Sequence, residues 1–262
     1  IAMEFMPVGD LRSLINMKNA QRPEERNWSE KEALIFVAQL VNGLRYLHQN
    51  EILHRDLKPS NIFLGENYRL AIGDFGISDN LTTTRMTRIV GTDDFLPAEA
   101  IEDREENLTY ARDMWSCGIL IYMISYLKHP FAEKNRIETM VNICEGKILF
   151  QFLKQISCLA KIHKTNSKFP KCENLLKLCL KSNVDERVAN ACLLAKDEYI
   201  ATILYQLDSG VKFSDMIFSG NFVEVIQRVN IQLENDKKKL ESDLKNKELS
   251  WKRQKSNYED NL

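Results

Sequence analysis

Four polar side chains in two short segments of this chain are suited to binding a hard cation and charged groups. Asp56, Lys58 and Asn61 lie in residues 53–64, and Asp74 opens an Asp-Phe-Gly tripeptide shortly afterwards. Carboxylate and amide oxygens are ligands that Mg²⁺ prefers, and Mg²⁺ takes few protein ligands because it keeps several waters. An Asx-rich turn is the alternative explanation. Two motifs in this order and at this distance are a much more specific signal than either alone.

The two segments resemble the catalytic loop and the magnesium-binding loop of protein kinases. The first contains His-Arg-Asp-Leu-Lys-Pro-Ser-Asn, and the second is Asp-Phe-Gly. This resemblance implies phosphoryl transfer, in which the protein mainly positions groups and neutralises charge. It implies that Asp56 orients the substrate hydroxyl and accepts its proton, while Lys58 balances charge on the γ-phosphate. Asn61 and Asp74 are then the metal ligands, and Asp74 also meets the phosphates of ATP.

The elements that position these groups are predicted on both sides of them. Ser29 and Glu32 form a capping box that opens a long helix, Glu30–Gln49, with an apolar stripe. This helix leads the chain to the first motif, and His48 near its end is expected to be an ordinary polar residue of a helix terminus. Residues 62–64 and 70–72 are predicted as two short strands joined by a turn. His54 and Phe75 are expected to be packed structural residues.

The first residues of the chain are predicted to form the nucleotide pocket. Residues 1–14 contain a short apolar strand, a Pro/Gly turn and a helix start. The kinase resemblance makes this segment the hinge. It implies that the backbone carbonyl of Glu4 and the backbone N–H of Met6 meet the adenine edge. Asp10 is expected to hold the ribose hydroxyls, and Phe63 to lie under the adenine ring.

The Thr-rich residues 79–88 look like an activation loop. Phosphorylation of Thr87, or else of Thr84, is expected to order this loop by pairing with Arg55. A solvated loop without such a role is the alternative.

The substrate loop is predicted in residues 91–99, which are similar to the family pattern Gly-Thr-x-x-Tyr-x-Ala-Pro-Glu but have Ala and Pro exchanged. The exchange affects the local shape of the loop because proline fixes its own φ and restricts the preceding residue. Glu99 is expected to form a buried ion pair with Arg187. Thr92 is expected to bond to the catalytic-loop aspartate and lysine, as in kinases that modify Ser and Thr.

The next segments resemble the body of the large kinase lobe. Asp113 begins the predicted central buried helix, and its carboxylate is expected to accept hydrogen bonds from the catalytic-loop backbone, since a buried carboxylate needs such partners. Another helix is predicted around residues 138–144. Residues 147–171 are longer than the family pattern suggests; they are interpreted as an insertion, helical in its first half, with no assigned function.

Composition limits the class of protein. The chain has 262 residues, 44% hydrophobic and 28% charged, with a net charge of −1, which describes an ordinary globular core and gives no support to nucleic-acid or membrane binding. The longest strongly apolar run, residues 117–127, is too short to span a bilayer. The six cysteines show no CxxC pair, so reduced thiols and a cytoplasmic location are expected, with the nucleus or the cytoskeleton as alternatives.

The predicted domains are a kinase hinge and large lobe in residues 1–207, a linker in 208–221 and a coiled-coil helix in 222–258. The last segment has no Pro or Gly and carries apolar residues on a heptad register with interruptions. Self-association through this coil is expected, and a single solvated helix is the alternative. Motifs such as Leu-Lys-His-Pro-Phe at 127–131 are similar to those of NIMA-related Ser/Thr kinases.

The expected fold is therefore mainly α with a few short strands. It comprises the large, C-terminal lobe and hinge of a protein kinase followed by a helical tail. The chain begins at Ile1, and the Gly-rich loop, the strand lysine and the helix with its paired glutamate are not found. The chain is thus expected to be an N-terminally truncated Ser/Thr kinase that uses ATP and Mg²⁺ and acts on protein substrates. The alternatives are a non-catalytic, pseudokinase-like binding module and a coiled-coil adaptor.

Overall fold

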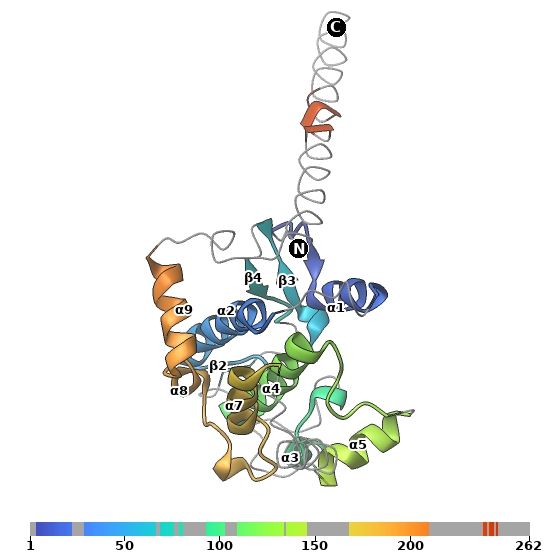
Figure 1. Ribbon diagram of the computed structural model, residues 1–262, viewed down its shortest axis with the longest axis vertical. Helices are drawn as coiled ribbons and strands as arrows, with labels where there is room; N and C mark the ends of the chain where they lie inside the picture. The colour runs from blue at the N-terminus through green and yellow to red at the C-terminus, as the bar shows by residue number, and fades with distance from the viewer. Residues whose placement is uncertain are drawn as a thin grey trace, which may run out of the picture.

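A computed structural model describes residues 4–22, 29–66, 69–75, 79–80, 93–102, 109–133, 135–145, 168–209, 238–239, 241–243 and 245 (Figure 1). Its α-helices are α1 (Leu11–Ala20), α2 (Glu30–Gln49), α3 (Ala98–Ile101), α4 (Tyr110–Tyr126), α5 (Arg136–Glu145), α7 (Pro170–Cys179), α8 (Ala191–Leu194) and α9 (Glu198–Asp208). The 3-10 helices are η2 (Pro59–Asn61), η4 (Asp93–Phe95) and η6 (Val184–Glu186). The strands are β1 (Gly9–Asp10), β2 (Ile52–Leu53), β3 (Ile62–Leu64), β4 (Leu70–Ile72) and β5 (Asp79–Asn80).

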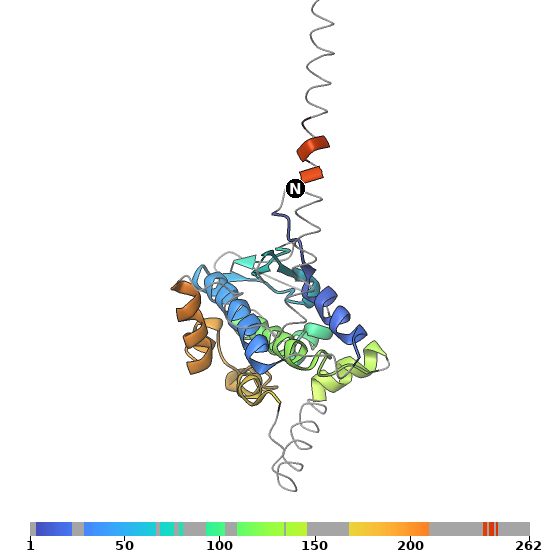
Figure 2. The same ribbon diagram turned by 45° about the horizontal axis from the view of Figure 1, so that its top comes forward.

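The described part is mostly helical with a small antiparallel sheet, as predicted. β3 pairs with both β1 and β4, so that Phe63 lies opposite Asp10 on one side and Ala71 on the other. β2 pairs with β5 in a separate two-stranded ladder. Figures 1 and 2 show α8 and α9 on one side of the domain, α1 and α5 on the other, and α2 and α4 between them.

Helix α2 forms where its capping box predicts. Ser29 Oγ accepts from the backbone N–H of Glu32 at 3.2 Å, and Glu32 Oε2 accepts from the backbone N–H of Ser29 at 2.8 Å. Two backbone donors that no helical carbonyl can reach are thereby satisfied. The apolar face of α2 is buried and packs against α4, α8, α9 and β4. The helix is a rigid base for the loop that follows it.

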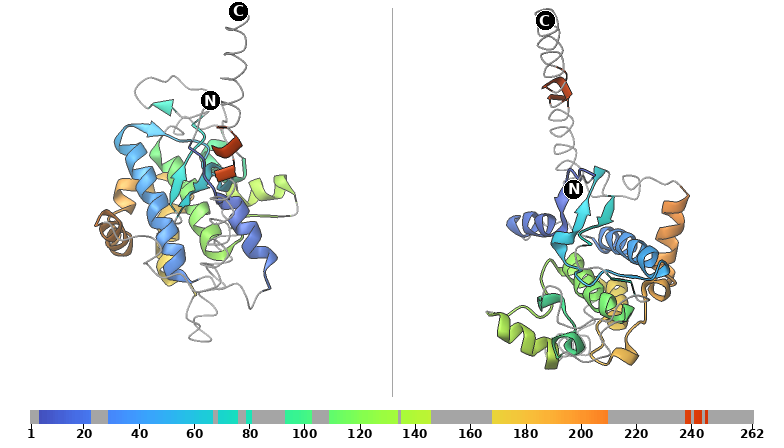
Figure 3. Two further views of the ribbon diagram at one scale, coloured as in Figure 1. Left: turned by 90° about the horizontal axis from the view of Figure 1, so that it is seen from above. Right: turned by 180° about the vertical axis from the view of Figure 1, so that it is seen from behind.

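Helix α4 is the centre of the core, and most of its residues are buried. It begins at Tyr110, three residues before the predicted start, and packs closely against α7 (Figure 3). A Cβ on Gly118 would lie 2.8 Å from Cys179 Cβ and from Leu180, so only glycine permits this approach of the two helices. Trp115 of α4 stacks on Phe131 at 5.5 Å between ring centroids.

Several predictions fall on residues outside those described. They include the activation-loop threonines Thr84 and Thr87, the substrate-loop residue Thr92, most of the 147–171 insertion and most of the 222–258 coil. The described residues of the tail, at 238–239, 241–243 and 245, are helical.

Two broader expectations concern membranes and cysteines. Among the described residues, no helix has both the length and the apolarity needed to cross a bilayer. The five described cysteines are free thiols.

Candidate active site

The backbone just before Asp56 is hydrogen-bonded to the buried carboxylate of Asp113 in α4. Asp113 accepts from the backbone N–H groups of His54 and Arg55, both at 2.9 Å. Arg55 has a φ of 70°, in the left-handed region that costs a non-glycine residue on the order of 1–3 kcal/mol. The hydrogen bonds to Asp113 stabilise this conformation. The predicted contact between Asp113 and the catalytic-loop backbone is confirmed.

His48 is part of the same support, and the expectation that it is an ordinary polar residue of a helix end is wrong. Its ring is buried, Nδ1 accepts from the backbone N–H of Ala191 at 3.1 Å, and Nε2 lies 3.2 Å from Asp113 Oδ2. Because Nδ1 is an acceptor, the ring proton is on Nε2 and is donated to the carboxylate. His48 thus connects α2, α4 and α8. Its position in the buried last turn of an apolar helix was the available signal.

The environment of Asp113 makes the stability of the domain depend on pH. Burial raises the pKa of this carboxyl, but the hydrogen bonds from His48 and from the backbone N–H groups of His54 and Arg55 outweigh it, so the pKa lies below its ordinary value. The ionised form therefore stabilises the folded state above the unfolded pKa of about 3.9, and this contribution is lost as pH falls through the lower folded pKa.

We expect Asp113→Asn to lower the free energy of unfolding by about 1.5–3 kcal/mol near neutral pH, because an amide cannot accept all three hydrogen bonds. The difference from the natural chain should narrow as the pH falls below about 4, because the carboxyl of the unfolded natural chain is then protonated, and it should be smallest below the lower folded pKa. Urea unfolding over a pH series measures this. Asp208→Asn, at an exposed position on α9, is the matched control. A deficit that does not change with pH would contradict this assignment.

Three of the predicted catalytic residues meet in one hydrogen-bonded group. Lys58 Nζ lies 2.6 Å from Asp56 Oδ2, and Asn61 Nδ2 donates to the same oxygen at 3.1 Å and to the Asp56 backbone carbonyl at 2.9 Å. The carboxylate of Asp56 is therefore fixed by a cation and an amide. Because the Asn61 nitrogen is used in these bonds, its amide oxygen is the atom left for a cation.

Pairing of β3 with β4 brings the second motif to the first. Ile62 lies opposite Ile72, and the backbone N–H of Gly73 donates to the Asn61 carbonyl at 2.9 Å, which puts Asn61 beside the start of Asp-Phe-Gly. His54 Nε2 also bonds to the Gly73 carbonyl at 3.0 Å. Asp74 follows with a φ of 62°, a strained backbone of the kind that often occurs at functional sites. The structure therefore brings Asn61 and Asp74 together.

Of the two residues expected to be packed, only His54 is. Its ring is fully buried, and its Nδ1 accepts from the backbone N–H of Asp56 at 3.3 Å. The side chain of Phe75 is 48% exposed, so the expectation that Phe75 is a packed residue is wrong. The Phe75 ring lies 5.2 Å from the His54 ring, which covers only part of its surface.

The predicted nucleotide-pocket residues lie along β1 and β3. Phe63 packs tightly on Gly73, where a Cβ would lie 2.7 Å from its ring. Asp10 caps α1, since its carboxylate accepts from the backbone N–H of Ser13 at 2.7 Å. The Met6 carbonyl accepts from Gly9 at 3.1 Å in a turn, and the Glu4 side chain forms an exposed ion pair with Arg69. The backbone groups of Glu4 and Met6 therefore precede a turn that feeds directly into β1.

The predicted ion pair between Glu99 and Arg187 is present and buried. Arg187 Nη1 and Nη2 reach the two oxygens of Glu99 at 2.5 and 3.1 Å. The guanidinium also donates to the carbonyls of Ala111 and Lys181 and lies 5.0 Å from the centre of the Trp115 ring. This arrangement connects α3, at the end of the predicted substrate loop, to α4 and to the turn before η6.

A second buried arginine lies next to the catalytic loop and was not identified from the sequence. Arg112, beside Asp113 in α4, is buried as completely as Arg55. Burial lowers the pKa of Arg112, as does the nearby charge of Arg55, while Asp113, Glu99 and Asp56 oppose this effect. The two guanidinium groups place positive charge between the catalytic loop and Glu99.

Magnesium and ATP are compatible with the donors at this site. The Asn61 amide oxygen and the Asp74 carboxylate are hard oxygen ligands of the kind Mg²⁺ takes. Among the described residues, no group of three or more His, Cys, Asp or Glu side chains is placed to hold a metal. Magnesium does not require such a group, because waters and substrate phosphates complete its coordination.

Comparison with known proteins agrees with this geometry. The protein kinase domain family matches residues 1–200. The chain belongs to the protein kinase family. It is 31% identical to the G2-specific protein kinase fin1 of Schizosaccharomyces pombe, over 89% of this chain and 32% of that protein. It is 35% identical to the serine/threonine-protein kinase Nek5 of Mus musculus, over 56% of this chain and 23% of that protein.

The relatives also place the chain within the family. Similarity to the two Nek5 proteins, from Mus musculus and Homo sapiens, confirms the resemblance to NIMA-related Ser/Thr kinases. Aurora kinase A-A of Xenopus laevis is 37% identical over 50% of this chain and 31% of its own length. The chain thus matches no more than about a third of the length of these relatives.

Proposed function

We propose that this chain is part of a protein serine/threonine kinase that transfers the γ-phosphate of Mg-ATP to Ser or Thr hydroxyls of protein substrates. The observation that carries this proposal is the Asp56 carboxylate, fixed by Lys58 and Asn61 in a loop held by Asp113. A carboxylate that is held in one orientation can orient a substrate hydroxyl group and accept its proton.

The other groups have roles that follow from their positions. Lys58 places its charge beside Asp56, where the transferred phosphoryl group must arrive, and so offsets negative charge that develops there. Asn61 and Asp74 would hold Mg²⁺, which neutralises phosphate charge when bound. Thr92, outside the described residues, is proposed to bond to Asp56 and Lys58 from the substrate loop.

The nucleotide would lie against the β1–β3 pair. Phe63 is proposed to support the adenine ring and Asp10 the ribose, because the two residues lie opposite each other in the sheet. The backbone carbonyl of Glu4 and the backbone N–H of Met6 are proposed to meet the adenine edge. Asp10 also caps α1, so ribose binding would share a carboxylate that already has a fixed orientation.

The test is transfer of labelled γ-phosphate from Mg-ATP to a basic and to an acidic generic protein, measured for the natural chain and for Asp74→Asn. We expect the variant to transfer phosphate about 10²- to 10³-fold more slowly, since asparagine would hold less firmly the Mg²⁺ that neutralises charge on the phosphates. Asp208→Asn should match the natural chain because Asp208 is exposed and lies on α9.

The same experiment addresses the alternative function. Equal background signal from the natural chain and from Asp74→Asn would reject phosphoryl transfer by these residues and favour a non-catalytic binding module or a coiled-coil adaptor. We further propose self-association through residues 222–258, supported by their heptad pattern and by the helical residues described there. Sedimentation of the same preparations, with and without these residues, gives the mass that tests it.

A further inference from the structure

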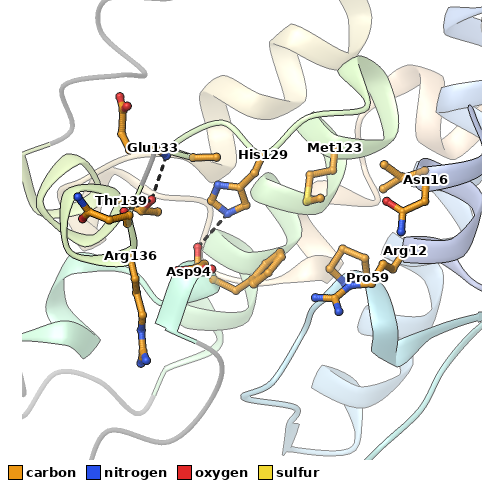
Figure 4. A pocket seen from close by; sticks show the side chains of 13 residues that line it. Arg12, Asn16, Pro59, Asp94, Met123, His129, Glu133, Arg136 and Thr139 are labelled. Carbon is orange, nitrogen blue, oxygen red and sulfur yellow. Dashed lines mark hydrogen bonds between the residues drawn. The ribbon is translucent and has the colours of Figure 1, made fainter. Parts of the chain in front are cut away.

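A pocket of about 380 Å³ lies next to the catalytic loop and is not accounted for by the groups that meet ATP (Figure 4). Its walls come from α1, η2, η4, the end of α4 and the segment that leads into α5. Pro59, which follows Lys58 directly, lines it, and so does Phe95 at the end of η4. A polypeptide whose hydroxyl group meets Asp56 therefore has this pocket beside it.

The floor of the pocket is apolar and its shape is fixed by His129. Ile15, Phe95 and Met123 supply apolar surface, and the first two are buried. His129 Nε2 donates to the Asp94 carbonyl at 3.0 Å, and Nδ1 accepts from the backbone N–H of Phe131 at 3.2 Å. Both ring nitrogens are thus used within the protein. Burial lowers the pKa of His129, against a smaller opposing effect of Asp94, so the ring is a neutral wall.

Four charged residues line the pocket: Arg12, Asp94, Glu133 and Arg136. Figure 4 shows Glu133 and Arg136 at one end and Arg12 near Pro59 at the other. At the first end Glu133 Oε1 accepts from Asn142 Nδ2 at 3.2 Å, and Arg136 provides a charge of opposite sign. Arg12 is the charged lining residue drawn next to Pro59, and Asp94, whose backbone carbonyl bonds to His129, is a further charged residue of the lining.

Arg12 is the group that has charge to offer a ligand. Its side chain is exposed on the first turn of α1, and within the described part of the chain it forms neither a hydrogen bond nor an ion pair. Asp10, two residues earlier, is occupied in capping the same helix. An arginine beside an apolar floor attracts a carboxylate more strongly than one in open water, because the local dielectric is lower.

We propose that Arg12 binds an acidic side chain of the protein substrate, so that this chain favours Ser or Thr residues with Asp or Glu nearby in the sequence. This proposal rests on the kinase function proposed above and adds a substrate class to it. Pro59 is three residues from Asp56 in the sequence, and α1 packs directly on η2, so the acidic residue must lie within a few positions of the hydroxyl.

The test measures binding without ATP, so that it is separate from phosphoryl transfer. Fluorescently labelled peptides with one serine carry Glu, Lys or Ala at each flanking position in turn, and their affinity for the full chain is measured by anisotropy. We expect at least one Glu position to bind about fivefold more tightly than its Lys counterpart, the scale of a partly exposed ion pair. Arg12→Glu should reverse that order.

Arg22→Glu is the matched control, since Arg22 is an exposed arginine just beyond the end of α1 and does not line the pocket. Thermal unfolding checks that both variants are folded. Arg12→Glu should not destabilise α1, because a glutamate in the first turn of a helix is favourable. The proposal is overturned if no Glu peptide is preferred, if Arg12→Glu keeps the order, or if Arg22→Glu changes it equally. Arg12-dependent binding without phosphate transfer would support the pocket and reject the kinase function.

Discussion

Replacing Arg187 with alanine is expected to lower the free energy of unfolding by about 3–5 kcal/mol, since it leaves a buried carboxylate without its partner. Arg187 and Glu99 are both almost fully inaccessible to solvent. The variant would also leave the carbonyls of Ala111 and Lys181 without the guanidinium donors they now have. Chemical denaturation followed by circular dichroism measures the loss directly.

Two controls separate the buried pair from charge in general. Glu186, next in the sequence, forms an exposed pair with Lys181 at 3.9 Å, and Glu186→Ala should cost less than about 1 kcal/mol. The double variant Glu99→Leu with Arg187→Met removes both charges and should be more stable than either single variant, because it leaves no charge buried alone. Equal losses in Arg187→Ala and Glu186→Ala would show that the pair contributes little.

Asp56→Asn is expected to slow phosphoryl transfer about 10²- to 10⁴-fold, the range that one positioned general base contributes. The asparagine has nearly the same shape and can still accept a hydrogen bond from Lys58, so the loop should keep its conformation. The measurement is the rate of label transfer from Mg-ATP at saturating ATP and protein substrate, with unfolding curves for the same samples.

The conservative control for Asp56 is again Asp208→Asn, an exposed position on α9. Nucleotide affinity should change little in Asp56→Asn, because Asp56 is assigned to the hydroxyl and not to the phosphates. A variant with unchanged transfer would remove Asp56 from the mechanism. A variant that has lost nucleotide binding in the same proportion as transfer would assign Asp56 to the nucleotide instead.

Short local sequence patterns predicted much of the fold and of the candidate site. The capping box of Ser29 and Glu32 predicts where α2 begins because both residues act within one helical turn. Residues 53–64 and 73–76 were sufficient to predict the family. The resemblance also predicted contacts between residues far apart in the sequence, namely that of Asp113 with the catalytic-loop backbone and that of Arg187 with Glu99. These succeeded because the motif specifies the packing as well as the residues.

Residues whose role depends on unmarked packing were not predictable in this way. His48 contacts Asp113, 65 residues away, and Ala191, 143 residues away, and nothing in its neighbouring sequence marks either partner. The exposure of Phe75 depends on what covers its ring, which the tripeptide Asp-Phe-Gly does not state.

The sequence alone therefore determined the family, and it predicted the chemistry and the types of the reacting residues, because those reside in short motifs with fixed spacing. Only the tertiary structure decided how His48 supports Asp113 and which charged residues line the pocket, with Arg12 next to Pro59. The burial of a side chain and the net charge around it depend on residues from many elements, as α1, η4 and α5 around one pocket show. These elements are far apart in the sequence and come together only when the chain folds.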